Sequence, residues 1–93
     1  MKKTIKLIHP KRKYPRMIEA AKSEIRKYIK RSRRQKLPDG QDYWDFDCTF
    51  GATEAEANKV HLTEIDKCIN ETEAAERESF FISIIPRAAK RNS

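Results

Sequence analysis

The sequence predicts an α+β fold in which a four-stranded antiparallel sheet is covered on one face by two helices. Apolar residues alternate in four short segments, which is the period of a strand, and recur every three or four residues in two longer segments, which is the period of a helix. These segments follow one another in the order β-α-β-β-α-β. With 93 residues, the chain can form one domain with a single hydrophobic core.

The first half of the chain predicts a strand and a long helix. Residues 4–8, TIKLI, alternate and contain β-branched side chains, which is typical of a strand. Pro10 and Pro15 mark the loop that follows. The next segment predicts an amphipathic helix from apolar residues at spacings of three and four, namely Ile18, Ala21, Ile25, Tyr28 and Ile29. Pro38 and the turn sequence PDG end this segment.

The second half predicts a hairpin, a second helix and a last strand. Residues 42–50 alternate strongly and end at Gly51, and residues 59–62, KVHL, are expected to be the third strand. Thr63 is expected to cap a helix that runs to residue 76. Residues 79–85, SFFISII, form the last strand, which Pro86 is expected to stop.

Two β-α-β units with right-handed crossovers give the split arrangement of a ferredoxin-like sandwich. Residues 1–86 are assigned to this single domain, and residues 87–93, RAAKRNS, to a flexible basic tail. In this topology, Tyr43 and Phe81 are expected on edge strands.

Strand alternation predicts which residues line each face of the sheet. The helix-covered face takes most large apolar residues, namely Ile5, Leu7, Trp44, Phe46, Cys48, Phe50, Val60, Leu62, Phe80, Ile82 and Ile84. The open face is mixed and has three apolar positions, Ile8, Phe81 and Ile85. If these three residues group together, they form an exposed patch of the kind that binds a protein partner.

The composition argues against membrane insertion, export and a metal centre. No apolar run approaches the roughly 20 residues that span a bilayer, and the apolar part of the N-terminus is too short for a signal peptide. We therefore expect a cytoplasmic protein with no membrane contact. Cys48 and Cys68 lie twenty positions apart without metal-ligand spacing, which favours two reduced, buried thiols over a disulfide or a zinc site. We expect no cofactor.

The net charge of +7 is unevenly distributed along the chain. Residues 1–36 hold 15 Lys and Arg against two Glu, which is a net charge of +13. Residues 37–86 hold 3 Lys and Arg against 12 Asp and Glu, a net charge of −9, and residues 87–93 add +3. This dipolar layout suits a polyanion, a protein partner or the fold itself.

The basic residues of the first helix and its preceding loop predict contact with phosphates. An anion at the helix N-terminus would also relieve the repulsion between these cations and the helix dipole, and would use free backbone N–H groups. The predicted site, for nucleic acid or another polyanion, comprises Lys11, Arg12, Lys13, Arg16, Lys27, Lys30, Arg31, Arg33 and Arg34. The alternative is a solvated helix whose charge is partly offset by the second helix, through Glu64, Glu71, Glu73 and Glu78.

Asp45, Asp47 and His61 are expected close together on the open face. Carboxylates and imidazole can share a metal ion, but we favour surface pairs in which the aspartates hold Lys6, Lys59 or His61. No serine or cysteine stands in a catalytic motif. We therefore predict no catalytic residues, no metal and no enzyme activity.

Three segments, KKTIKLIHPK, WDFDCTFGAT and VHLTEIDKCI, resemble a family of short uncharacterised bacterial proteins, a domain of unknown function. The resemblance runs over residues 2–82. It implies a bacterial cytoplasmic protein without an assigned activity, and it transfers no catalytic residues.

Two functions are therefore expected. The leading one is a non-enzymatic module whose basic helix and preceding loop bind a polyanion, with nucleic acid as the partner. The alternative is a protein-interaction or homodimerisation module that uses the open sheet face around Ile8, Phe81 and Ile85.

Overall fold

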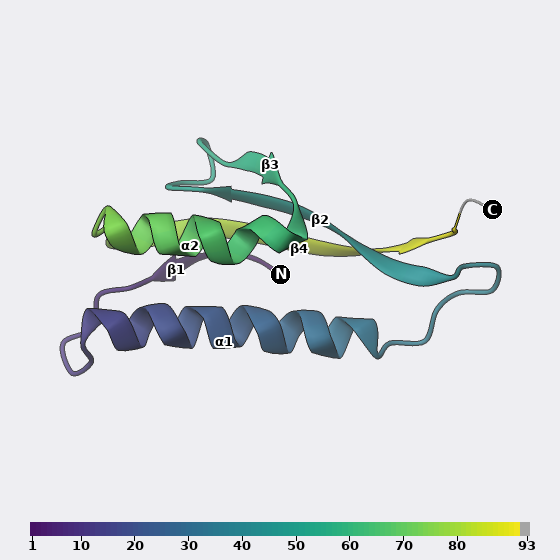
Figure 1. Cartoon of the computed structure of the whole chain (residues 1–93), viewed down its shortest axis with the longest axis horizontal. Coiled ribbons are helices and arrows are strands. Elements are labelled where there is room, and N and C mark those ends of the chain that lie inside the picture. The colour runs from purple at the N-terminus through teal and green to yellow at the C-terminus, as the bar shows by residue number, and fades with distance from the viewer. Residues whose placement is uncertain (92–93) are drawn as a thin grey trace.

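The computed structural model describes residues 1–91 and confirms the predicted order of strands and helices (Figure 1). The elements are β1 (Lys2–Lys6), α1 (Tyr14–Arg33), β2 (Tyr43–Gly51), β3 (Asn58–Val60), the 3-10 turn η1 (Leu62–Glu64), α2 (Ile65–Ala74) and β4 (Ser79–Ala89). No helix among these residues is long and apolar enough to cross a membrane.

The four strands form one antiparallel sheet in the order β1-β4-β2-β3. α1 connects β1 to β2, which run parallel with β4 between them. α2 connects β3 to β4, which run parallel with β2 between them. The predicted α+β class, with a four-stranded antiparallel sheet and two helices, is therefore confirmed.

The order of the strands differs from the expected one. β2 and β4 lie in the middle of the sheet, so the prediction that Tyr43 and Phe81 lie on edge strands is wrong. β2 and β4 are also the longest strands, with 9 and 11 residues, whereas β1 has 5 residues and β3 has 3. Short strands with charged side chains are suited to the edges, because they limit the pairing of unpaired N–H and C=O groups with another chain.

The hydrophobic core lies between the sheet and the two helices. All eleven residues predicted for the helix-covered face belong to the core or pack against it. α1 contributes Ile18, Ala21 and Ile25, and α2 contributes Ile65 and Ile69. Because both helices bury their apolar stripes against the same face of the sheet, their charged faces are both directed away from it.

β4 does not end at Pro86, as the sequence predicted, but continues to Ala89. Pro86 pairs with Phe46 of β2, and residues 87–89 of the expected flexible tail lie in the sheet. Residues 92–93 of that tail lie outside the described residues.

β4 can continue through Pro86 because of the direction of the Pro86 nitrogen. Ile84 N donates to Met1 O (2.7 Å), so even-numbered residues of β4 direct their amides away from β2. Pro86 lies beyond β1 and removes no ladder bond.

β2 and β4 together extend past the other strands as a two-stranded ribbon of residues 43–47 and 85–89 (Figure 1). The C-terminal end of α1 and the loop after it hold one face of this ribbon. Trp44 Nε1 donates to Gln35 O (2.9 Å), and the Arg33 guanidinium lies 5.6 Å from the centre of the Phe46 ring. The molecule is therefore elongated, with extents of 48 × 25 × 18 Å.

β3 is shorter than predicted, and the helical segment that follows it is capped by a different residue. β3 ends at Val60, and His61 rather than Thr63 is the capping residue. The N–H of Thr63 donates to His61 Nδ1 (3.4 Å), and the N–H of His61 donates to Glu64 Oε1 (3.0 Å). This reciprocal pair is a capping box, which starts η1 directly after the strand.

The orientation of Pro86 predicts how β4 tolerates proline at two neighbouring alanines. The N–H of Ala88 is directed to the open edge, whereas that of Ala89 is directed to Tyr43 on β2. Ala89→Pro should therefore lower the free energy of unfolding by about 1–3 kcal/mol more than Ala88→Pro, because it leaves an acceptor on β2 unpaired. Urea unfolding of the two variants measures the difference. Equal losses would contradict the assigned strand edge.

Candidate functional site

The nine residues of the predicted polyanion site are all exposed. Within residues 1–91, none of them lies in an ion pair. They form two groups, because Lys11, Arg12, Lys13 and Arg16 lie at the start of α1 and the other five lie in its C-terminal half. Residues 16 and 27 are eleven positions apart, which is roughly 16 Å along a helix.

Five acidic residues of the described chain form ion pairs, and their partners are cations outside the predicted polyanion site. Glu24 pairs with Lys3, and Asp66 Oδ2 lies 3.2 Å from Arg26 Nη2. Lys22 Nζ also donates to Asn70 Oδ1 (2.6 Å), so the contacts between α1 and α2 lie on one flank of α1. The four glutamates expected to offset the charge of α1 form no ion pair with it in residues 1–91.

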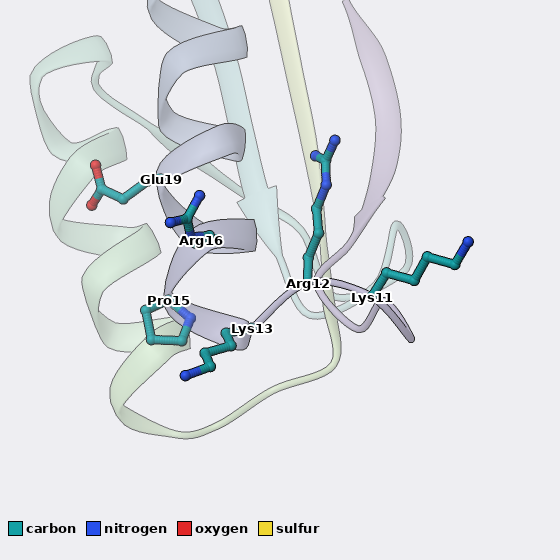
Figure 2. Close-up of a pocket in the computed structure, with 6 residues that line it drawn as sticks. All are labelled: Lys11, Arg12, Lys13, Pro15, Arg16 and Glu19. Carbon is teal, nitrogen blue, oxygen red and sulfur yellow. The ribbon is translucent and has the colours of Figure 1, made fainter.

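The hollow at the start of α1 does not gather its cations around one point. It has a volume of about 690 Å³ and is lined by Lys11, Arg12, Lys13, Pro15, Arg16 and Glu19. Figure 2 shows the Lys11, Arg12 and Lys13 side chains extending in different directions, with the Glu19 carboxylate on the side of Arg16. In this arrangement the four cations do not converge on a single small anion.

The backbone at this end of α1 also offers fewer free donors than the sequence suggested. Pro15 has no N–H, and the N–H groups of Arg16 and Met17 donate to Lys13 O (3.0 and 3.2 Å). Pro15 occupies one of the first helical positions, which is where proline is best tolerated. Two of the N–H groups expected to be free for an anion are therefore bonded, and a third is absent.

A groove with a different character lies between the C-terminal half of α1 and η1. It has a volume of about 610 Å³ and is lined by Arg26, Ile29, Lys30, Arg33, Arg34, Leu62 and Thr63. Ile29 and Leu62 are half-buried and pack against the core, so they form an apolar floor. Four of the seven lining residues are cations, and only Arg26 has a carboxylate partner in the described part of the chain.

Sequence reasoning selected three residues of this groove, Lys30, Arg33 and Arg34, and missed the rest. The signal for those three was the basic face of the helix. Leu62 and Thr63 are thirty residues away in the chain, and they reach α1 only because the capping box at His61 turns the backbone after β3. No local pattern of a single sequence shows this contact.

The sequence favoured surface pairs of Asp45 and Asp47 with Lys6, Lys59 or His61. In the structure, both aspartates pair with Arg87 instead. Arg87 Nη2 donates to Asp45 Oδ2 (2.8 Å), and Arg87 Nε donates to Asp47 Oδ2 (3.1 Å). The hydrogen bond and charge of Asp47, together with the charge of Asp45, raise the pKa of Arg87. The error follows from assigning Arg87 to a tail. In the described residues, no group of three or more His, Cys, Asp or Glu side chains is placed to hold a metal ion.

The apolar patch expected on the open face is not continuous. Ile8 and Ile85 are 58% and 48% exposed, but Phe81 is only 5% exposed. Phe81 and Ile85 line one small hollow together with Ala57 and Glu54 of the connection between β2 and β3, and Glu54 pairs with Lys2 (3.2 Å). Lys6 pairs with Ser79, which lies six residues, or roughly 20 Å, from Ile85 along β4. Ile8 follows Lys6 by two residues and therefore lies still farther from Ile85.

The two cysteines are free thiols, as expected. Cys48 is fully buried, and burial raises its pKa to about 11, with smaller contributions from the charges of Asp47 and Asp45. Cys68 is half-buried, and burial also raises its pKa. Burial therefore favours the protonated thiol at both positions, which is the less nucleophilic form.

A family model described as "Family of unknown function (DUF6172)" matches residues 1–93. No curated protein and no solved structure gives a significant match.

The raised pKa of Cys48 predicts a loss of stability at alkaline pH. The thiol stays protonated in the folded state up to about pH 11, whereas it ionises above its ordinary value of 9.0 when the chain unfolds. The unfolded state therefore gains ionisation free energy, and the free energy of unfolding falls as the pH rises from 9.0 to about 11. Urea unfolding across this range should show a smaller fall for Cys48→Ala than for wild type. The matched variant Cys68→Ala should keep most of the fall, and identical slopes for all three proteins would contradict the assignment.

Proposed function

The chain belongs to the family of unknown function DUF6172, and we propose that it is a non-enzymatic module that binds nucleic acid through the basic face of α1. The observation that carries the proposal is the set of nine exposed cations that have no carboxylate partner in residues 1–91. A polyanion with regularly spaced charges can contact many of them at once and release its counterions.

The C-terminal half of α1 is the stronger part of this surface. Lys27, Lys30, Arg31 and Arg34 lie three or four positions apart, so their charges are neighbours on the helix surface. Like charges at these spacings destabilise a helix by roughly 0.2–0.5 kcal/mol for each pair. A line of phosphates along α1 would remove this repulsion.

The helix dipole explains only part of this arrangement. Lys30, Arg31 and Arg33 lie in the last turn of α1, where each cation stabilises the helix by roughly 0.3–1 kcal/mol. Lys27 lies before that turn, and Arg16 lies in the first turn, where the dipole disfavours a positive charge. A polyanion would supply a counter-charge for these two residues.

The proposal places the protein in the cytoplasm, where nucleic acid and free thiols occur together.

The alternative function, self-association through the open sheet face, has less support because Phe81 is buried and Ile8 is distant from Ile85. What favours it is the exposed Ile85 on the open face of the ribbon, which also carries the exposed Tyr43. A sedimentation mass above 11.0 kDa that Ile85→Glu abolishes would support this alternative.

Salt-dependent binding tests the proposal. A fluorescent oligonucleotide should bind at about 50 mM salt, and its affinity should fall steeply by about 200 mM. The variant Lys27→Glu/Lys30→Glu/Arg34→Glu should weaken binding at least about tenfold and lower the slope of log affinity against log salt by about 2–3. Fluorescence anisotropy measures both quantities.

A control variant separates local contacts from net charge. Lys6→Glu/Lys59→Glu/Lys90→Glu changes the net charge equally, at exposed positions outside α1. It should change the affinity less than about threefold, since distant charges are screened within roughly 8–10 Å. Absence of binding by the wild type at low salt, or equal losses in the two variants, would refute the assigned surface.

A further inference from the structure

We propose that the groove between α1 and η1 makes the protein selective for single-stranded nucleic acid, by accepting one unstacked base while neighbouring cations hold its phosphates. This inference rests on the proposed function, because it names the form of nucleic acid that the basic face binds. It concerns the groove lined by Arg26, Ile29, Lys30, Arg33, Arg34, Leu62 and Thr63.

The size of the groove suits a base rather than a phosphate alone. Its volume of about 610 Å³ lies within the range of roughly 300–1,000 Å³ that is typical of small-molecule sites. A phosphate group is smaller and hydrophilic, and it would remain at the rim where the lysine and arginine side chains end. The interior of the groove is therefore available to a flat ring.

The floor of the groove is apolar and partly accessible. Ile29 and Leu62 pack against the hydrophobic core and are half-buried, so each still exposes some apolar surface to the groove. Covering that surface is favourable for any apolar face that enters. A duplex presents its sugar-phosphate backbone outward and keeps its bases stacked, so it would leave this floor uncovered. A single strand can turn a base onto it.

The cations at the groove are held in different ways. Arg26 is neutralised by Asp66, whereas Lys30, Arg33 and Arg34 have no acidic partner in the described residues. Arg33 is also held in position, because its guanidinium lies over the Phe46 ring. A guanidinium held in this way can hydrogen-bond a phosphate or stack on a base, which are contacts that single-strand binding proteins use.

The basic surface continues beyond the groove, which favours a nucleic acid over an acidic peptide. Lys27 lies one turn before Lys30 on α1, so cations follow the helix surface away from the groove. A strand with one charge on every residue matches this row along its length. Thr63 is the neutral polar residue of the lining, and its hydroxyl lies 3.0 Å from His61 Nδ1. It offers a hydrogen-bonding group to the edge of a bound base.

The experiment compares three ligands of the same length, about 12 nucleotides. They are a single strand, the same sequence as a duplex, and an abasic strand that keeps the phosphates but lacks the bases. Competition against a labelled single strand should show that the single strand binds about fivefold or more tightly than either of the others.

Two tryptophan variants test the groove itself. Thr63→Trp fills the groove without removing a core side chain, since Thr63 is exposed. It should weaken binding of the single strand about fivefold and leave duplex and abasic binding unchanged. The matched variant Ala55→Trp, at an exposed position in the connection between β2 and β3, should change none of the three affinities.

The outcomes separate this inference from the proposed function. Equal affinity for the three ligands, with no effect of Thr63→Trp, would overturn the groove assignment while nucleic-acid binding by α1 stands. Preference for the duplex would also overturn it. Absence of binding to all three ligands at low salt would refute the proposed function. Binding of polyglutamate, without binding of any of the three nucleic acids, would also refute the proposed function and would indicate an acidic protein partner.

Discussion

The pairing of β4 with β2 over nine residues is the interaction on which the rest of the structure depends. β4 also pairs with β1 along its other edge, so it links both halves of the chain. Its residues Phe80, Ile82 and Ile84 are fully buried and receive both helices on one face of the sheet. Because α1 and α2 must cover the same face, the basic outer surface of α1 lies beside the acidic α2 rather than on the opposite side of the molecule.

This neighbouring placement does not neutralise α1. The two helices touch along one flank, through Arg26 with Asp66 and Lys22 with Asn70. The remaining cations of α1 are directed away from α2, since a helix exposes several rows of side chains and a neighbour covers only one of them. The uneven charge of the sequence thus becomes an uneven surface, and the groove at η1 gives that surface an apolar centre.

The periodicity of the apolar residues predicted the elements and the core correctly, because helices and strands impose their own repeat on the chain. It did not predict the strand order, because alternation shows which face a residue lies on but not which strand lies next to it. Pro86 shows this limit most clearly. Proline stops a strand only where its N–H is needed, and the open edge beyond β1 removes that need. The error at Pro86 placed Arg87 in a tail and so hid the partner of Asp45 and Asp47.

The candidate site was only partly predictable for the same reason. The cations of α1 stand out in the sequence, but the loop cations around Lys11 diverge in space and those around Lys30 adjoin a groove. The partners that complete the groove, Leu62 and Thr63, come from a turn whose capping residue is a histidine rather than the threonine that the sequence suggested. Burial of Phe81 depends in turn on the connection between β2 and β3, which carries no apolar periodicity.

Chemical-shift mapping of the 15N-labelled protein with a short single-stranded oligonucleotide is the most direct test of which surface binds. The basic face of α1 and the groove predict that the largest shifts fall on residues 26–34 and on Leu62 and Thr63, and that they disappear at high salt. Largest shifts on the open sheet face, at Tyr43, Asp47 and Ile85, would contradict this assignment and place the binding surface on the opposite side of the sheet.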